Sequence, residues 1–359
     1  MINIIEEETK LKNLFEIKNV KIKTKKYGNN LKKILYCFAF IFILTIIGII
    51  IFSSINYYNA DIFTFNQDIN NKYIKSQNYF CDNQKLFNNK KFEDKIRLID
   101  IKFNDLKFNM YVYNNSDTVS GTMIANKAWE VSHTNKLLKA LNYYENKKNI
   151  KTKDIYIIDI GANVGWYSFI FGKYGYNIIS FEPSMLNMYI LKKNFCLNKE
   201  INITLINKGL FNEEKVCYLY SHINNQGDGF VKCNENQTLS DFYKKEGEII
   251  LTQLSNYLSF FKNKNLALIK MDVEGAEGKA FDGGIELITK YHIPFIFFEF
   301  DPRFLKRLGT DLKKFLQLFA DNGYKISIKD FFNDYISVDD VINKNTQLNL
   351  YIVYSKILE

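Results

Sequence analysis

Beyond residue 150, the chain alternates between short, continuous apolar runs and longer segments with helical spacing. Continuous apolar runs are typical of strands buried on both faces of a parallel sheet, and the intervening segments are long enough for crossover helices. The pattern predicts an α/β fold with a doubly wound, mostly parallel sheet. Strands are expected at 155–160, 177–182, 202–207, 266–272 and 294–300, with helices near 165–173, 184–196, 276–289 and 303–321.

The segments around this core are also patterned. Strands are expected at 96–103 and 107–113 and a helix at 135–146, and the runs 326–329 and 348–354 can close the sheet edge. The segment 210–262 is longer than a normal connection between core elements. Its pieces 215–220 and 229–233 predict a hairpin, so we expect this insertion to cover a substrate.

A second hydrophobic feature lies near the N-terminus. Residues 34–52 are nineteen consecutive residues without a charge, enough to cross a hydrocarbon layer of about 30 Å as one helix. A secretory signal peptide would have a shorter apolar core and a cleavage site of small residues. Seven lysines closely precede the run, whereas only Lys72 occurs in the twenty residues after it.

This charge asymmetry predicts the topology of the chain, because positive flanks stay in the cytosol. We expect a basic cytosolic tail at 1–33, a transmembrane helix at 34–52, a stem at 53–91 and a large domain at 92–359. The predicted location is a single-pass membrane protein whose large domain is lumenal or otherwise extracytoplasmic.

Composition changes this interpretation in two respects. The net charge is +9, but the only arginines are Arg97, Arg303 and Arg307, and nucleic-acid sites usually depend on arginine. A nucleic-acid partner is therefore not expected. Four cysteines beyond the apolar run (Cys81, Cys196, Cys217 and Cys233) permit disulfides, but three pairings are possible and none is favoured.

The most informative motif begins at the end of the first core strand. Asp159 ends the strand, Gly161 and Gly165 frame a turn that contains Asn163, and Glu182 ends the next strand. This arrangement is how a Rossmann-like sheet holds an adenosine. We expect the glycines to let the backbone approach the ligand, because a Cβ would collide with it, and Glu182 to accept hydrogen bonds from both ribose hydroxyls.

The spacing of the turn favours one adenosine cofactor. The G-x-G start of a dinucleotide site is missing, and Asp159 would repel a phosphate but attract a cationic amino group. S-adenosylmethionine (SAM) has an ammonium, a sulfonium and no phosphate, so SAM is the predicted cofactor. An ordinary glycine-rich turn between strand and helix is the alternative.

A second acidic motif follows the strand expected at 266–272. Lys270, Asp272, Glu274 and Glu277 lie together at a carboxyl end, where open parallel sheets bind ligands. We predict that Asp272 and Glu274 are catalytic. Like-charge repulsion would raise at least one carboxyl pKa, with Lys270 opposing it, as suits a general base.

Three alternatives remain open for these acids. Glu274 and Glu277 could simply favour a helix N-terminus. Asp272, Glu274 and Glu299 could bind a divalent metal, and Glu299 could instead contact substrate or end its strand in solvent. Zinc is not expected, because neither the three histidines nor any cysteine pair has ligand spacing, and no metal is predicted.

Together these motifs resemble the FkbM methyltransferase family. The resemblance spans 117–301. It rests on three motifs: Asp159 with Gly161-Ala162-Asn163-Val164-Gly165, Glu182-Pro183, and Lys270-Met271-Asp272-Val273-Glu274-Gly275-Ala276-Glu277. It implies a class I, SAM-dependent, Rossmann-like fold with a seven-stranded sheet, and O-methylation of small or sugar-like acceptors. It also implies that Glu130, after Trp129, lies near the cofactor. The predicted cofactor-binding residues are Asp159, Gly161, Asn163, Gly165, Glu182 and Glu130.

The sequence therefore predicts a membrane-anchored SAM-dependent methyltransferase acting on a sugar, a glycan or another small hydroxyl acceptor. A non-catalytic module that keeps the fold is one alternative. A nucleotide-dependent oxidoreductase is another, although the chain lacks the G-x-G start and an obvious hydride-transfer site.

Overall fold

The computed structural model describes residues 62–65, 81, 90–114, 117–223, 225–233 and 241–359. The chain divides into residues 1–58 and 59–359, and all described residues belong to the second unit. Among the helices described, none is both long and apolar enough to cross a membrane. The run 34–52 lies outside the described residues, so the transmembrane helix stays a prediction.

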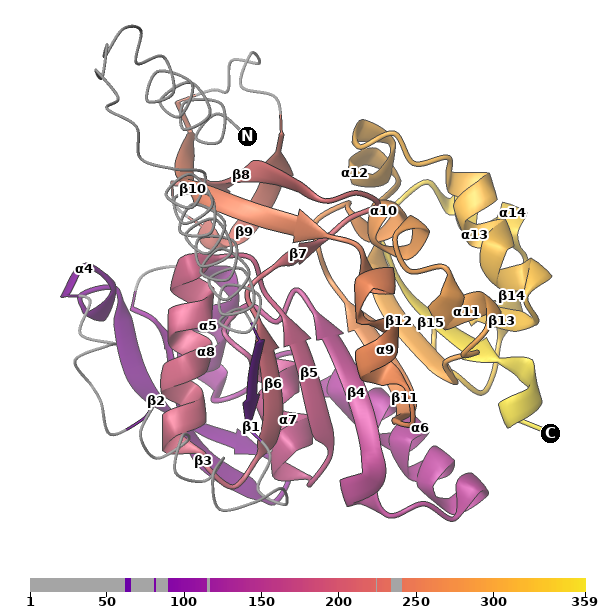
Figure 1. Cartoon of the computed structure of the whole chain (residues 1–359), viewed down its shortest axis with the longest axis horizontal. Coiled ribbons are helices and arrows are strands. Elements are labelled where there is room, and N and C mark those ends of the chain that lie inside the picture. The colour runs from indigo at the N-terminus through magenta and orange to yellow at the C-terminus, as the bar shows by residue number, and fades with distance from the viewer. Residues whose placement is uncertain (1–61, 66–80, 82–89, 115–116, 224, 234–240) are drawn as a thin grey trace, which may run out of the picture. The chain divides into compact units, whose positions relative to one another are not determined.

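A nine-stranded sheet carries the fold (Figure 1). Five of its strands are mutually parallel and lie in the spatial order β6 (Asn202–Ile206), β5 (Asn177–Phe181), β4 (Ile155–Ile160), β11 (Asn265–Met271) and β12 (Phe295–Phe300). β15 (Leu348–Tyr354) pairs antiparallel with β12, and β13 (Tyr324–Ser327) pairs antiparallel with β15. These strands are the predicted seven-stranded, mostly parallel sheet. The edge strands β1 (Ile62–Phe65) and β14 (Tyr335–Ile336) extend it to nine.

The order of the strands fixes where a ligand can bind. From β4 the chain continues outward to β5 and β6, and it later returns to β11 on the other side of β4. The strand order therefore reverses between β4 and β11, and an open crevice forms at their carboxyl ends.

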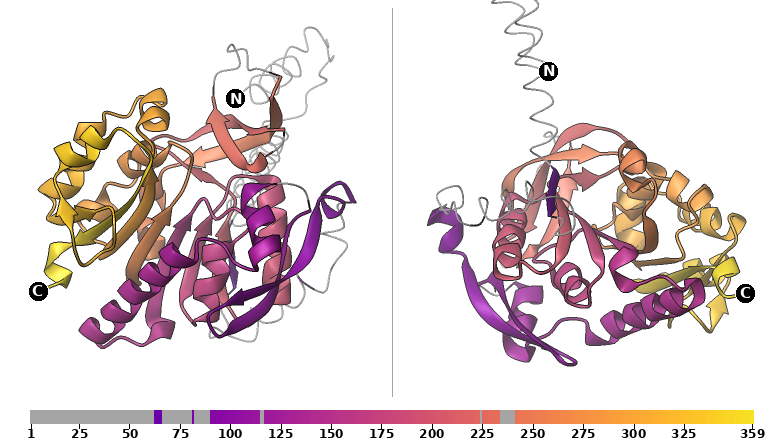
Figure 2. Two further views of the ribbon diagram at one scale, coloured as in Figure 1. Left: turned by 180° about the vertical axis from the view of Figure 1, so that it is seen from behind. Right: turned by 60° about the horizontal axis from the view of Figure 1, so that its bottom comes forward.

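Each face of the sheet has its own hydrophobic core. One face is covered by the hairpin β2–β3 (Ile96–Phe103 and Leu106–Tyr113) and by α5 (Thr118–Asn126), α6 (Val131–Lys148), α7 (Trp166–Lys173) and α8 (Met185–Leu197). The other is covered by α9 (Leu258–Phe261), α10 (Glu277–Asp282), α11 (Glu286–Thr289), α12 (Pro302–Arg307), α13 (Leu312–Asp321) and α14 (Val338–Lys344). Seen from behind, α6 and the hairpin lie in front of the large sheet (Figure 2). Side chains of β4 alternate between the two cores.

Two of the expected helices are each divided by glycine. The segment expected as one helix at 276–289 forms α10 and α11, and that expected at 303–321 forms α12 and α13. A Cβ on Gly283, which follows α10, would lie 2.0 Å from the carbonyl oxygen of Phe211. Gly309 has a φ of 74°, a left-handed conformation that interrupts the second helix.

The long insertion forms a separate four-stranded sheet. Its strands are β7 (Gly209–Leu210), β8 (Lys215–His222), β9 (Asn225–Lys232) and β10 (Tyr243–Thr252), in the order β7-β10-β8-β9. The β8–β9 hairpin confirms the prediction, but β10 was not expected. The first part of β10 is exposed and polar, so it lacks the apolar pattern from which a strand is predicted.

Two disulfides resolve the open cysteine pairing. Cys81 pairs with Cys196 in α8, and Cys217 in β8 pairs with Cys233. Cys81 and β1 both come from the segment interpreted as a stem. At least these parts of it are joined to the large domain, one by a disulfide and one through pairing with β6.

Candidate cofactor and catalytic site

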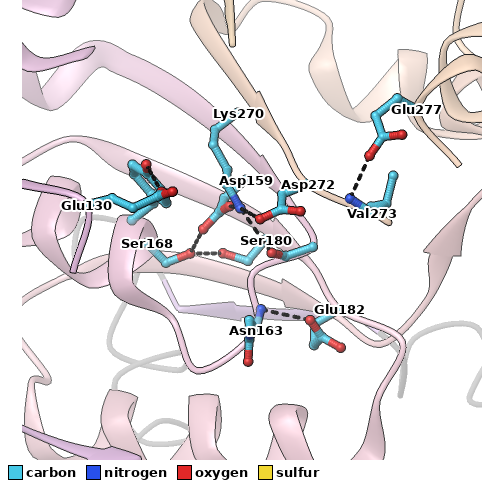
Figure 3. Close-up of polar contacts among 12 residues, drawn as sticks. Glu130, Asp159, Asn163, Ser168, Ser180, Glu182, Lys270, Asp272, Val273 and Glu277 are labelled. Carbon is cyan, nitrogen blue, oxygen red and sulfur yellow. Dashed lines mark hydrogen bonds and ion pairs between the residues drawn. The ribbon is translucent and has the colours of Figure 1, made fainter. Parts of the chain in front are cut away.

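A cavity opens at the carboxyl ends of the central strands. Its lining combines the turn after β4, the end of β5, the loop after β11 and the insertion sheet. Of the predicted site residues it includes Gly161, Asn163, Glu182, Asp272 and Glu274. Asp159, Gly165 and Glu130 are not among the lining residues. Figure 3 shows the polar contacts around this cavity.

The two glycines are required by the packing of the chain itself. Gly161 has a φ of 76°, and a Cβ there would lie 1.9 Å from the carbonyl oxygen of Asp272. A Cβ on Gly165, with a φ of 97°, would lie 2.7 Å from side-chain atoms of Leu191 and Phe169. Packing within the chain is thus a reason for both glycines in addition to the expected one, close approach of a ligand, which stays a prediction. Gly161 lets the turn touch the loop that carries Asp272.

Glu182 lies directly after β5, and only 4% of it is exposed. Its Oε2 accepts a hydrogen bond from the backbone N–H of Asn163, and its Oε1 accepts one from the N–H of Ser184, both at 2.8 Å. Burial raises the pKa of Glu182 to about 7, although these N–H groups oppose the shift. The side chain of Asn187 also donates a hydrogen bond to Glu182. A carboxylate has about four acceptor positions, so Glu182 keeps about one position for a ligand in the cavity.

Asp159 belongs to a buried polar row across the sheet. Ser180 of β5 and Lys270 of β11 are its register partners on the neighbouring strands. Ser168 of α7 donates to Asp159 Oδ2 at 2.5 Å and lies 2.8 Å from Ser180 Oγ. Burial raises the pKa of Asp159, and the ammonium of Lys270, 3.7 Å from its Oδ1, opposes that shift. The acid expected to attract a cofactor ammonium thus has a cationic partner within the protein.

The acidic loop after β11 divides its carboxylates between cavity and interior. Asp272 and Glu274 line the cavity, and the Asp272 side chain is 46% exposed. Glu277 is buried, and its Oε1 accepts a hydrogen bond from the N–H of Val273 at 3.0 Å. Burial, with a smaller contribution from Asp272, raises the pKa of Glu277 to about 8. Glu277 therefore stabilises the loop conformation at the start of α10, in line with the alternative that it favours a helix N-terminus.

The other two acids lie beside the cavity. Glu130 precedes α6, and its Oε2 accepts a hydrogen bond from the hydroxyl of Tyr167 at 2.5 Å. Burial, followed by repulsion from Asp272, raises the pKa of Glu299 to about 7. Among the described residues, no three His, Cys, Asp or Glu side chains come together to hold a metal ion. The alternative ligand set of Asp272, Glu274 and Glu299 is therefore not assembled.

Several residues that line the cavity were not among the predicted site residues. Tyr167 follows the glycine turn and Asn187 lies in the first turn of α8, so their proximity to the motifs was a usable signal. Leu219, Val231 and Leu251 of the insertion also line it. No local pattern identifies them, because the fold alone brings them to this place. They put the insertion at the cavity, where it was expected to cover a substrate.

Comparisons with known proteins bear on this site. The model of the methyltransferase FkbM domain matches residues 159–326, and no curated protein matches the chain. Among solved structures, the bifunctional kinase-methyltransferase WbdD gives a TM-score of 0.39 at 8% identity, covering 66% of this chain and 43% of that one. The T. thermophilus 16S rRNA methyltransferase RsmC gives 0.33 at 10% identity, covering 72% and 50%. The chain thus spans half or less of the length of both.

A third solved structure is the Pyrococcus abyssi tRNA (uracil-54, C5)-methyltransferase, with a TM-score of 0.32 at 12% identity and coverage of 71% and 44%. These likenesses are too low to support an argument about acceptor or activity. The family-model match covers just under half of the chain, from Asp159 to residue 326, and includes both cavity motifs. In these motifs, residues 159–326 are similar to the methyltransferase FkbM domain.

Proposed function

We propose that this protein is a SAM-dependent methyltransferase that methylates a hydroxyl oxygen of a sugar, a glycan or another small acceptor. The observation that carries the proposal is the common cavity. It joins Gly161, Asn163 and Glu182 to the carboxylates of Asp272 and Glu274, at the point where the strand order reverses.

The residues of the cavity fit the cofactor. Glu182 retains acceptor capacity beyond the backbone N–H groups of Asn163 and Ser184 and the side chain of Asn187, which suits a ribose hydroxyl. The side-chain oxygen of Asn163 is buried without a hydrogen-bond partner, and a buried acceptor of this kind favours a ligand that donates to it. SAM, when bound, supplies an electrophilic methyl group on a sulfonium.

The acidic loop supplies what the acceptor needs. The exposed carboxylate of Asp272, with Glu274 beside it, can take the proton of an acceptor hydroxyl as its oxygen bonds to the methyl carbon and the carbon–sulfur bond breaks. Leu219, Val231 and Leu251 form an apolar wall of the same cavity. Such a wall keeps water from a reacting centre and aligns the two reactants.

We also propose that residues 34–52 anchor the protein in a membrane and that the catalytic domain lies on the extracytoplasmic side. The lysine-rich flank supports this orientation. The two disulfides are consistent with an oxidising compartment. Because SAM is made in the cytosol, this placement requires imported cofactor.

The test combines binding with turnover in the full-length chain. Calorimetry should detect SAM but not NAD, and labelled methyl should enter one of the fractionated glycan, lipid or protein pools. Asp272→Asn or Glu274→Gln should lower turnover by about 10²-fold or more while SAM still binds. Asp282→Asn, an exposed change at the end of α10, is the control.

Each result has a distinct consequence. Absence of SAM binding would overturn the proposal, and NAD binding in its place would favour the oxidoreductase. SAM binding without transfer to any pool would favour the non-catalytic module. Full turnover in both loop variants would remove Asp272 and Glu274 from the mechanism.

A further inference from the structure

We propose that Lys270 is a positioning residue that fixes the catalytic loop at Asp272 against the cofactor turn at Gly161. The inference rests on the proposed function, because it assigns these two loops to acceptor and cofactor. Lys270 itself sits within the last part of β11, one position before the strand ends.

The ammonium of Lys270 contacts both loops and the strand β4. It donates a hydrogen bond to the carbonyl oxygen of Gly161 at 3.2 Å. It lies 3.7 Å from Asp159 Oδ1 and 3.8 Å from Asp272 Oδ2. Figure 3 shows the side chains of Asp159 and Asp272 beside this nitrogen.

The two carboxylates differ in how firmly they are held. Asp159 is completely buried and is bonded to Ser168, whereas the Asp272 side chain is 46% exposed. Lys270 is therefore anchored at its Asp159 side and restrains Asp272 at the other. Without this restraint, an exposed aspartate can adopt several rotamers, and general-base catalysis depends on one geometry.

The charge on Lys270 persists despite its burial. Only 6% of its side chain is exposed, and burial lowers the pKa of an ammonium. Asp159 and Asp272 oppose this effect, and the resulting pKa of Lys270 is above its usual value. The cation also lies 5.1 Å from the ring centre of Tyr167, whose hydroxyl is bonded to Glu130.

If Lys270 only stabilised the fold, a variant that regains stability without Lys270 should also regain wild-type exchange in the turn and wild-type turnover. Replacing both members of a buried ion pair by uncharged groups often costs little stability, whereas removing one member leaves an unpaired buried charge. Lys270→Met should therefore destabilise the fold, and adding Asp159→Asn should recover most of that loss. The recovered fold still lacks the cation that joins Gly161 to Asp272.

The experiment compares full-length wild type, Lys270→Met, the double variant Asp159→Asn/Lys270→Met, and Lys264→Met as the control. Lys264 precedes the opposite end of the same strand and packs over Tyr156 and Phe260. Urea unfolding, amide hydrogen exchange over residues 160–165 and methyl transfer are measured on each. We expect the double variant to regain stability, to exchange faster in the turn, and to lose about tenfold or more in turnover, while the control matches wild type.

Two outcomes overturn the inference. One is a double variant that regains wild-type stability, exchange and turnover together, since Lys270 would then only balance Asp159. The other is wild-type exchange at 160–165 in the double variant, whatever the turnover. If wild type neither binds SAM nor transfers methyl, the proposed function fails separately, and the exchange measurement still decides whether Lys270 joins the two loops.

Discussion

Asp159 and Glu182 end neighbouring strands and were both predicted to hold the cofactor, yet their environments differ. Asp159 lies within β4, points to the face covered by α7, and is neutralised by Lys270. Glu182 lies one residue beyond β5 and lines the cavity. Asp159 is the next-to-last residue of β4 and Glu182 is the first residue after β5, so two positions relative to the strand end separate a buried, ion-paired carboxylate from a cavity-lining one. The sequence motif predicted the same role for both acids and did not specify this difference in environment.

Glu182 leads to a prediction about pH. Its pKa of about 7 means that the carboxylate gains a proton as the pH falls through neutrality, and the protonated form has fewer acceptor positions for ribose hydroxyls. SAM affinity should therefore rise with pH between about 6 and about 8 and then level off. Glu182→Gln should weaken binding by about tenfold or more and remove the pH dependence. Calorimetric titrations across this range provide the measurement.

Glu299→Gln is the matched control for this titration. Glu299 also has a pKa raised to about 7, but it does not line the cavity. The variant should keep the pH dependence of wild type. If Glu299→Gln removes the pH dependence and Glu182→Gln does not, the assignment of Glu182 to the cofactor is wrong.

At the level of elements, a substitution of Gly283 tests how tightly the end of α10 packs against the insertion. Gly283→Ala would place a Cβ 2.0 Å from the Phe211 carbonyl oxygen, so α10 or the start of the insertion must move. We expect a loss of about 1–3 kcal/mol in the free energy of unfolding. Gly121→Ala, in α5 with no atom within 4 Å of the added Cβ, should instead gain about 0.5–1 kcal/mol. Urea unfolding measures both, and equal effects would show that helix propensity alone governs the two sites.

The elements that the sequence predicted well are those whose structure follows from their own residues. The central strands β4, β5, β6, β11 and β12 match the continuous apolar runs, because burial on both faces requires such runs. The expected helix at 276–289 ends early at Gly283, where the backbone packs against Phe211, a residue far away in the chain. β10 was not predicted, because its exposed half has no alternation of apolar and polar residues. The two cavity motifs were predictable from their glycines and acids, whereas the insertion wall was not.

At the scale of the whole molecule, the site is assembled from parts distant in sequence. The glycine turn after β4, the acidic loop and the insertion meet only because β11 returns beside β4 and the insertion sheet leads into β11. The disulfide between Cys81 and Cys196 adds a link across 115 residues. It ties the segment before the hairpin to α8, which starts beside Glu182. Cross-links of this span restrict the unfolded chain strongly, and they persist mainly outside the cytosol.

This link makes the proposed topology testable through the thiols. The chain has five cysteines, and the two disulfides account for four of them. In sealed vesicles with the cytosolic face outward, an extracytoplasmic domain should resist added protease. After denaturation without reductant, a polymer-linked maleimide should add once, at Cys37, and after reduction it should add at all five. Digestion of the domain in intact vesicles, with five additions before reduction, would instead place the domain in the cytosol. SAM import would then be unnecessary, and the lysine-rich flank would not set the orientation of this protein.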